Sequence, residues 1–462
     1  MHSQNKKKIT LINTPKKVFG DTNTTELGID NSYPIGLLLI SSQLKNYSDK
    51  LGLEVRFIDA NFYHKNPWNI ANEVQSDYIG LNATFPNVDI AKLTAKLIKE
   101  ANPNSKIILG GPAATLAPEY LLNNSSIDYI VMGEGEQTIV ELINALNFSK
   151  DISTIKGIAY KSLDELIITP KRNPMNLNET PLIDILEIPE EIRKYSREIY
   201  LITSRGCSNY CNFCSTPTIW GAGIKNLRVQ SNDQLFKELK NYKDNGFEFD
   251  IVHFLDDSFT ENWDRINNFI NRWNKSYGKK GISWRCLSRV NAINNKYKIK
   301  KMVESGCKSV SVGVESASPR ILKDIGKGLK IKEVDNFLDI TSQYGLKTKG
   351  FIMLGFPEET EGEAISTINY MVNSKFDEIG INIVMAYPRT RLYNQVHKKG
   401  ELSIPKFKSI VPKSYDKKVT RSLNKYSALP TISLSKHLDI DRLYYLKELG
   451  FRLFYEKREH IT

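Results

Sequence analysis

The sequence predicts an α/β protein with two parallel-sheet domains, a doubly wound domain followed by a partial (β/α)6 TIM-like barrel, and a small, mostly helical C-terminal extension. Two observations predict this architecture. Short apolar runs alternate with amphipathic helical patterns twice along the chain. Between these two regions, a stretch with Pro170, Pro174 and Pro181 lacks periodicity and is typical of a hairpin and linker. The expected boundaries are 1–150, 151–197, 198–400 and 401–462.

In the first region, five apolar runs bounded by turns are predicted as strands. They cover residues 7–13, 53–59, 77–83, 106–111 and 128–134. Helical patterns occupy residues 34–44, 87–101, 116–123 and 137–146. Near-continuous apolar strands that alternate with helices are typical of a parallel sheet covered on both faces. Ligands of such a domain bind at the carboxyl ends of the strands.

The second region contains six further strand patterns. They are IYLITS (199–204), FDIVHFL (249–255), ISWRCLS (282–288), SVSVGVE (309–315), KTKGFIML (347–354) and GINIVMA (380–386). Helical patterns occupy residues 232–243, 262–274, 331–344 and 362–374. In a barrel of this kind, functional residues lie at the strand carboxyl ends. Residues 433–457 form an amphipathic pattern, interpreted as a helix that closes the barrel or lines its cavity, with a basic interfacial membrane helix as the alternative.

Composition narrows the functional classes. The net charge is +12, from 64 basic and 52 acidic residues, and no Lys/Arg block with interleaved aromatics indicates nucleic-acid binding. Five cysteines in a long chain are not a disulfide scaffold. No run approaches the roughly 18–20 apolar residues of a membrane span. We therefore expect a cytoplasmic protein with reduced thiols.

Three of the cysteines form one motif directly after the first barrel strand. Cys207, Cys211 and Cys214 have CxxxCxxC spacing after Gly206. Three thiols in one loop can hold a soft metal centre, and three ligands leave one iron of a [4Fe–4S] cluster without a protein ligand. The alternative, a structural zinc site, requires four protein ligands. Cys286 and Cys307 lie on separate predicted elements and are interpreted as core residues.

Together with Phe213, the three cysteines resemble the signature of the radical S-adenosylmethionine (SAM) superfamily, over residues 198–400. The resemblance implies a [4Fe–4S] cluster whose open iron binds SAM, and a 5′-deoxyadenosyl radical that abstracts hydrogen. It also implies SAM contacts, for which an ordinary ion pair at the barrel mouth is the alternative interpretation of the charged members. These candidates are Phe213, Asp256, Asp257, Arg289, Glu315, Ser316 and Gly355, the last in the turn with Phe356 and Pro357. Arg389 departs from the family, which has glycine at this position, and puts the local backbone shape in doubt.

The first domain resembles the cobalamin-binding domain of B12-dependent radical SAM enzymes. The matching stretches are PIGLLLISSQLK (34–45), EVRFIDAN (54–61), GLNATFP (80–86), ILGGPAATLAPEYL (108–121) and DYIVMGEGEQT (128–138). The implied cobalamin contacts are Thr14, Thr84, Gly110, Gly111, Gly133, Glu134, Gly135 and Glu136. The DxHxxG motif that supplies a lower cobalt ligand is missing, since His64 has the wrong spacing, so base-off cobalamin is implied. The alternative is a nucleotide- or flavin-binding domain, although the sequence has no GxGxxG.

The resemblance implies a cobalamin-dependent radical SAM enzyme, first of all a methyltransferase that acts on an unactivated carbon. The alternatives are an oxidative cyclase or rearrangement enzyme with the same cofactors, and a non-catalytic cofactor-binding protein. A methylthiotransferase acting on tRNA should carry three further cysteines in its N-terminal domain, and residues 1–206 contain none. The expected partners are a small-molecule or peptide substrate and an electron donor such as flavodoxin or ferredoxin.

Overall fold

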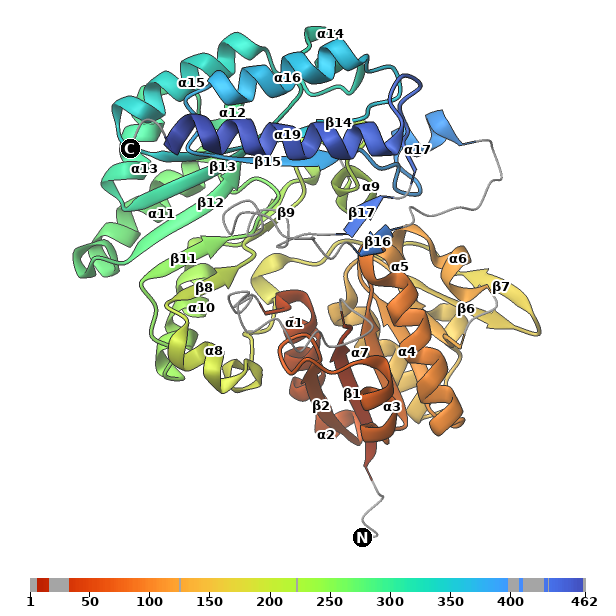
Figure 1. The fold of residues 1–462 in the computed structure, drawn as a ribbon. Helices are drawn as coiled ribbons and strands as arrows, with labels where there is room; N and C mark the ends of the chain where they lie inside the picture. The colour runs from red at the N-terminus through yellow and green to blue at the C-terminus, as the bar shows by residue number, and fades with distance from the viewer. Residues whose placement is uncertain are drawn as a thin grey trace. The chain divides into compact units, whose positions relative to one another are not determined.

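The computed structural model describes residues 6–15, 33–123, 126–221, 223–397, 407–409, 428–430 and 432–459. These residues form two compact units (Figure 1). The first contains the described residues up to Ser196 together with 234–248, and the second contains the described residues of 197–233 and those from Phe249 on. Residues 234–248 group with the first unit because helix α10 (Asn232–Asp244) bonds to it. Asn241 Nδ2 donates to the carbonyl of Ile183 at 2.8 Å.

The first unit is built on a seven-stranded sheet with the order β2-β1-β3-β4-β5-β6-β7. Its strands are β1 (Lys7–Asn13), β2 (Leu53–Asp59), β3 (Tyr78–Asn82), β4 (Lys106–Gly110), β5 (Tyr129–Val131), β6 (Ile158–Ser162) and β7 (Glu165–Ile168). Strands β1 to β5 are parallel, and the hairpin predicted in the linker adds β6 and β7 antiparallel to them. The strand order reverses at β1, so the crevice expected to bind ligands lies between the ends of β1 and β3.

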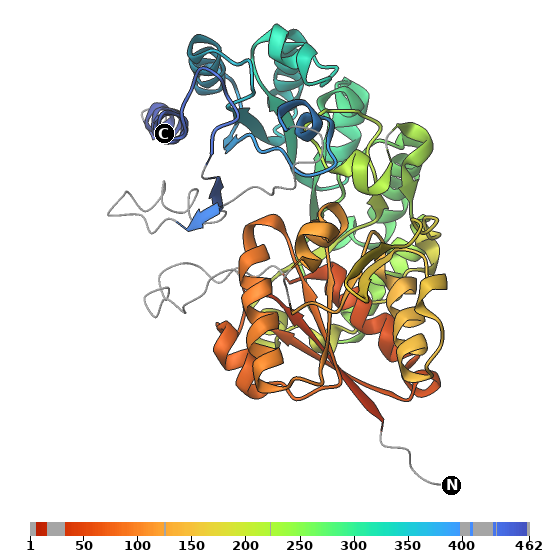
Figure 2. The ribbon, with the colours of Figure 1, turned by 90° about the vertical axis from the view of Figure 1, so that its right-hand side faces the viewer.

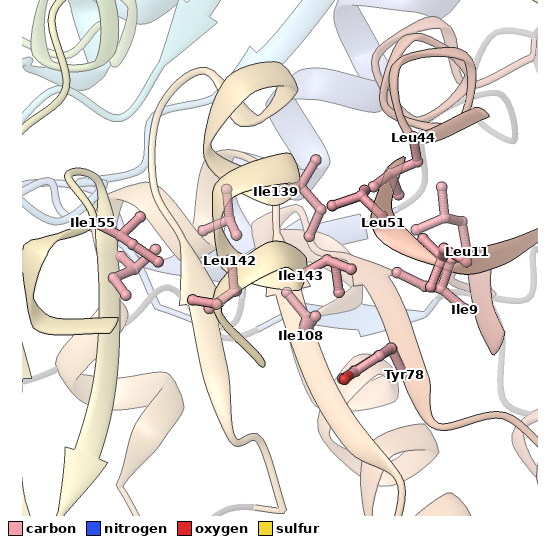
Figure 3. Packing of buried hydrophobic residues seen from close by; sticks show 14 of the residues in the cluster. Ile9, Leu11, Leu44, Leu51, Tyr78, Ile108, Ile139, Leu142, Ile143 and Ile155 are labelled. Atoms are coloured by element: carbon pink, nitrogen blue, oxygen red, sulfur yellow. The ribbon is translucent and has the colours of Figure 1, made fainter. Parts of the chain in front are cut away.

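Helices cover both faces of this sheet, as a doubly wound fold requires (Figure 2). They are α1 (Ile35–Asn46), α2 (Ser48–Leu51), α3 (Pro67–Glu73), α4 (Val88–Ala101), α5 (Pro112–Leu116), α6 (Pro118–Leu122) and α7 (Gly135–Asn147), and α8 (Glu190–Tyr195) follows in the linker. Figure 3 shows how α7 packs on the sheet: Ile139, Leu142 and Ile143 lie against Ile108 and Leu11. These side chains are at most 4% exposed, and burial of this apolar surface is the main stabilising term.

The second unit contains a six-stranded parallel sheet with the order β15-β14-β13-β12-β11-β8. Its strands are β8 (Glu198–Leu201), β11 (Ile251–Phe254), β12 (Ser283–Ser288), β13 (Cys307–Glu315), β14 (Lys347–Leu354) and β15 (Glu378–Ile383). The two edge strands β8 and β15 do not pair with each other in the described part of the chain. The predicted partial barrel is therefore confirmed as an open sheet.

Further helices and two short ribbons complete the second unit. The helices are α9 (Thr216–Trp220), α11 (Trp263–Ser276), α12 (Val290–Ile293), α13 (Lys296–Glu304), α14 (Pro319–Asp324), α15 (Ile331–Gln343), α16 (Glu361–Asn373), α17 (Arg391–Val396) and α19 (Ile440–Glu459). The ribbons are β9 (Ser204–Arg205) with β10 (Arg228–Val229), and β16 (Phe407–Ser409) with β17 (Ala428–Pro430).

The predicted C-terminal helix is α19, which begins at Ile440 and packs against α16 and β15 (Figure 1). Leu443, Leu446 and Phe454 of this helix are completely buried. Its apolar face is therefore used inside the unit, which favours the barrel-closing interpretation over the membrane helix. Among the described residues, no helix is long and apolar enough to cross a membrane.

The barrel sheet has one apolar face toward the helices and one concave, inner face. A Cβ placed on Gly350 of β14 would lie 2.6 Å from the Met371 side chain of α16, so this register position faces the helices. A Cβ on Gly380 of β15 would lie 2.5 Å from the Phe351 ring, so these two positions share the other face. Because side chains alternate along a strand, every second residue of each strand faces the inside of the barrel.

Candidate functional site

The three cysteines lie in one loop between β9 and α9, where the chain leaves the first barrel strand. Cys207, Cys211 and Cys214 are free and half-buried. Burial raises the pKa of each thiol, that of Cys214 to about 11. The Lys327 ammonium and the Arg289 guanidinium act in the opposite direction on Cys211, so its pKa is raised less than burial alone would raise it. A thiol must lose its proton to bind metal, so these two cations favour the metal-binding form.

The donor set fits a cluster. Three thiols on one eight-residue stretch, with two cations beside the central one, match the three-cysteine ligand set of a [4Fe–4S] cluster. In the described part of the chain, no three His, Cys, Asp or Glu side chains, these cysteines included, lie together as a group that could hold a metal ion, so the fit rests on the residue types and their spacing. Cys286 and Cys307 are completely or almost completely buried on β12 and β13, as expected of core residues.

The ends of the cysteine loop are held together by Asp257. Its Oδ2 accepts from the Gly206 amide at 3.2 Å, and its Oδ1 accepts from Thr216 Oγ1 at 2.9 Å. Gly206 directly precedes the first cysteine and Thr216 closely follows the last one. The centre of the loop is fixed elsewhere: the Asn212 amide donates to the carbonyl of Ile325 at 2.9 Å. Asp257 is thus a positioning residue for the loop as well as a predicted SAM contact.

The neighbouring Asp256 has a different environment. Its side chain is completely buried, and its Oδ1 accepts from the Thr203 amide at 3.1 Å, from Thr203 Oγ1 at 3.0 Å and from Ser204 Oγ. Burial raises the pKa of Asp256, and the nearby Arg265 acts in the opposite direction. Asp257 is exposed. Of the two carboxylates predicted to contact SAM, Asp257 is therefore the accessible one, and Asp256 fixes the strand end behind it.

Arg289 reaches the cysteine loop through a small polar network. Its Nη1 bonds to Ser208 Oγ and, at 3.2 Å, to Glu261 Oε1, while Ser208 Oγ donates to Glu261 Oε2 at 2.7 Å. Ser208 directly follows the first cysteine of the motif. Arg289, the candidate contact of the SAM carboxylate, is therefore already oriented by the Glu261 carboxylate. Neither Ser208 nor Glu261 was predicted from the sequence.

Glu315 ends β13 beside the cysteine loop. Its Oε1 accepts from Lys327 Nζ at 2.7 Å, and both side chains are about nine-tenths buried. The φ angle of Glu315 is +71°, a strained conformation for a residue other than glycine. Burial works to lower the pKa of Lys327, but the Glu315 carboxylate outweighs it and the pKa is raised. The adjacent Ser316 is completely buried, and its hydroxyl lies 3.2 Å from Thr367 Oγ1.

The turn after β14 joins the cysteine loop through an aromatic contact. Phe213 packs against Phe356 with 5.9 Å between ring centroids. Gly355 has φ +93°, and a Cβ there would lie 2.7 Å from Leu443 of α19, so only glycine fits. At the next strand end, Arg389 adopts φ +66°. The chain thus keeps at Arg389 a left-handed backbone that glycine adopts without strain.

A buried carboxyl that was not predicted from the sequence holds this turn. Glu359 is completely buried, and its Oε2 accepts from the amides of Gly355 at 2.6 Å and Phe356 at 3.3 Å. Its Oε1 has no hydrogen-bond partner in the described part of the chain. Burial raises the pKa of Glu359 to about 7. In the sequence, its position as an acidic residue in the glycine turn after the fifth barrel strand could have indicated Glu359.

This carboxyl predicts a pH-dependent stability. Because its pKa is higher in the folded than in the unfolded chain, folding takes up a proton between about pH 4.5 and 7, and the folded state loses stability as the pH rises through that interval. The loss amounts to about 3 kcal/mol at most. Glu359→Gln should remove this dependence and be more stable than the wild type at pH 8. Denaturant unfolding of both proteins at pH 5 and pH 8 checks this, and equal pH slopes would contradict it.

At the ends of the first-unit strands, the predicted cobalamin residues differ in accessibility. Thr84 is exposed, and Gly133 is partly exposed with φ +71°, where a Cβ would meet no described atom within 4 Å. A bulky ligand can approach the backbone there. Thr14 and Glu136 are buried. Gly111 serves packing, because a Cβ there would lie 2.7 Å from the carbonyl of Ala83.

The remaining candidates in this region bond within the protein. The carbonyl of Gly110 accepts from the Ala83 amide at 2.8 Å, and Glu134 Oε2 accepts from the Met175 amide at 2.7 Å. A Cβ on Gly135 would lie 2.9 Å from Ile40 of α1. The strand ends also carry amide and carboxylate side chains that were not predicted, such as the pair formed by Asn13 Nδ2 and Asp59 Oδ1 at 2.8 Å. In the sequence, the polar residues that end β1, β2 and β3 could have indicated them.

Two family models match the regions that contain these candidate residues. Residues 201–371 match the model of the radical SAM superfamily, and residues 30–143 match that of the B12 binding domain. An uncharacterized methyltransferase of Pyrococcus horikoshii is 30% identical over 428 residues, 91% of this chain and 87% of that protein. A putative methylthiotransferase of Methanocaldococcus jannaschii is 27% identical over 401 residues, 83% of this chain and 81% of that protein.

The fold has a solved counterpart. The radical SAM methyltransferase TsrM of Kitasatospora setae, with tryptophan substrate and a SAM analogue bound, aligns with a TM-score of 0.69 at 15% identity, over 88% of this chain and 79% of that chain. The fold, both family models and the extensive match to a methyltransferase lead to one assignment. The chain belongs to the cobalamin-dependent radical SAM enzymes, among their methyltransferases, and its cofactors are a [4Fe–4S] cluster, SAM and cobalamin.

Proposed function

We propose that this enzyme transfers a methyl group from methylcobalamin to an unactivated carbon of a small-molecule or peptide substrate. The observation that carries the proposal is the cysteine loop at the mouth of an open parallel barrel, in a chain whose preceding domain matches the B12 binding model. When bound, the reduced cluster and SAM supply the radical that removes a hydrogen atom, and methylcobalamin supplies the methyl group.

The chain's own groups prepare the cluster site. Cys207, Cys211 and Cys214 are the ligands, and each must release a proton because burial raises the pKa of all three thiols. Lys327 stabilises the thiolate of Cys211. Asp257 fixes the two ends of the loop that supplies the three sulfur atoms.

The same elements fit SAM. The exposed carboxylate of Asp257 and the buried carboxylate of Glu315 suit its amino group, and Arg289 suits its carboxylate, because charge-assisted hydrogen bonds are the strong ones. Phe213 and Gly355 are the proposed apolar and backbone contacts. Ser316 and Asp256, which are buried behind these groups, then act by positioning.

In the first unit, Thr84, Gly110, Gly133, Glu134 and Gly135 are the proposed cobalamin contacts at the strand ends. Residues 1–150 form the proposed cobalamin domain and residues 198–400 the radical SAM domain. The cluster needs an electron donor, for which we propose a flavodoxin or ferredoxin, and a cytoplasmic location would keep its thiols reduced.

Isotope labelling tests the function. The reaction contains the reconstituted enzyme, cobalamin, a reductant and SAM with a trideuterated methyl group. We expect a product in which one hydrogen of the substrate is replaced by the trideuterated methyl group, with the corresponding increase in mass. To detect this product, mass spectrometry compares a bacterial extract treated with the wild-type enzyme with the same extract treated with the Cys211→Ala variant. A product lighter by two hydrogens, with no added carbon, would instead establish the oxidative cyclase. Bound cofactors without any 5′-deoxyadenosine would establish a binding protein.

A further inference from the structure

The inner face of the barrel sheet carries a row of ionic and hydroxyl side chains beside apolar ones such as Leu287 and Phe351. Barrel interiors are ordinarily filled by bulky branched apolar residues. Here the inner positions of five strands hold a mixed-charge set, well below the strand ends that carry the cluster loop. The set consists of Glu198 on β8, His253 on β11, Arg285 on β12, Ser309 and Ser311 on β13, and Lys349 on β14.

Arg285 lies on this inner face and retains donor capacity. It reaches over β11 to Glu198 on β8, where its Nε and Nη2 both lie 2.5 Å from the same carboxylate oxygen, Oε1. His253 Nδ1, on the strand between them, lies 3.6 Å from that oxygen. The Arg285 side chain is 37% exposed and makes no other hydrogen bond in the described part of the chain. A guanidinium has five N–H donors, so Nη1 is available to a second acceptor.

Two serines and a lysine continue the row on the next two strands. Arg285 is in register with Ser309, and Ser311 is in register with Lys349. Lys349 Nζ lies 3.2 Å from Glu378 Oε2, and the Lys349 side chain is 34% exposed. Both serines are half-buried, and neither hydroxyl has a hydrogen-bond partner among the described residues. Two cations therefore flank two unused hydroxyl groups across three adjacent strands.

Stability does not account for this arrangement. Partly exposed ion pairs contribute between about 0 and 1 kcal/mol to the free energy of unfolding. Apolar residues of similar size would stabilise a barrel interior at least as well. A row of donors, by contrast, matches the lone pairs of a carboxylate or a phosphate. Glu198 and Glu378 are the counter-ions of Arg285 and Lys349, and each of the two cations keeps N–H groups that these contacts do not use.

We propose that Arg285, Ser309, Ser311 and Lys349 form an anion subsite, and that the methyl acceptor is a small molecule with a carboxylate or phosphate group remote from the reacting carbon. This inference rests on the proposed function and specifies its substrate class. Ser311 and Glu315 lie on the same strand, and four residues of a parallel strand span about 13 Å. An acid group held at Ser311 therefore positions a carbon several bonds away near the cluster end of the barrel, and remote binding of this kind orients a reacting atom.

Ligand-observed NMR tests the subsite on the reconstituted holoenzyme, with saturating SAM and hydroxocobalamin to fill the cofactor sites. The probes are glutarate and glycerol 3-phosphate, with glutaramide and glycerol as neutral counterparts. We expect at least one acid to bind and its neutral counterpart not to bind. Arg285→Gln and Lys349→Gln should each weaken that binding by about tenfold or more. Arg272→Gln, which removes the same charge from the exposed outer surface of α11, should leave it unchanged.

The outcomes separate the ligand classes and the two proposals. Binding of glutarate alone establishes a carboxylate, binding of glycerol 3-phosphate alone a phosphate, and binding of both a general anion subsite. Equal binding of acids and neutral counterparts, or full binding in the Arg285→Gln and Lys349→Gln variants, overturns the inference. Reductive formation of 5′-deoxyadenosine from SAM is measured on the same samples. If 5′-deoxyadenosine forms while no anion binds, the anion subsite is wrong and the proposed radical SAM chemistry is retained. If anions bind but no 5′-deoxyadenosine forms, the proposed function is wrong and the anion subsite is retained.

Discussion

Replacement of Cys211 by alanine is expected to abolish cluster assembly and the reductive cleavage of SAM. Cys211 is the central thiol of the loop, and Lys327 and Arg289 both act on it. Loss of groups that merely support a metal ligand costs about 10- to 100-fold in affinity or activity, so loss of the ligand itself should cost more than about 100-fold. Iron and sulfide content, visible absorbance and 5′-deoxyadenosine formation measure the effect.

The matched control is Cys286→Ala. It removes the same thiol from β12, where Cys286 is 1% exposed and distant in sequence from the motif. Its cluster content and SAM cleavage should remain those of the wild type, with only a modest loss of stability from the small cavity. Equal iron content in Cys211→Ala and the wild type would show that the cluster ligands have been misassigned.

Asp256→Ala is expected to destabilise the fold by about 3 kcal/mol or more. It leaves the buried Arg265 without its nearby carboxylate and deprives Thr203 and Ser204 of a shared acceptor. Breaking a buried charge pair from one side costs about 3–5 kcal/mol, because the remaining charge is left uncompensated. Denaturant unfolding at neutral pH measures the change in the free energy of unfolding.

The adjacent Asp257→Ala should show the opposite pattern. Asp257 is exposed, so its loss should change stability little, but it releases both ends of the cysteine loop. We expect SAM cleavage to fall by about 10- to 100-fold, as for other groups that orient metal ligands, in a protein that unfolds close to the wild-type midpoint. A large loss of stability in Asp257→Ala, or none in Asp256→Ala, would reverse the roles assigned to the two carboxylates.

Sequence patterns predicted the elements of this fold well, because each depends on local periodicity. Continuous apolar strands predicted both parallel sheets, and CxxxCxxC spacing predicted the cluster loop, whose ligands are close in the chain. Lys327 and Glu261 were not predicted, because their partners Glu315, Ser208 and Arg289 lie on other segments and the contacts form only when strand ends converge. Glu359 bonds to amides of its own turn, and its complete burial is evident only in the packed chain. The assignment of residues 234–248 to the first unit also depends on long-range contacts, such as that between Asn241 and Ile183.

The sequence by itself determined the fold class and the two-domain order, since these follow from periodicity within short stretches of chain. Its motifs implied the cofactor set through their resemblance to a known family. Only the tertiary structure decided which side chain of each candidate pair is accessible. Asp256 and Asp257 are adjacent residues of the same type, yet Asp256 is enclosed by Thr203 and Ser204, whereas Asp257 bonds to both ends of the cysteine loop. Likewise, Arg285 and Lys349 are 64 positions apart, and only the pairing of β12, β13 and β14 places them on either side of two serines. Accessibility and charge neighbourhood are properties of the packed chain, and they decide what each residue can do.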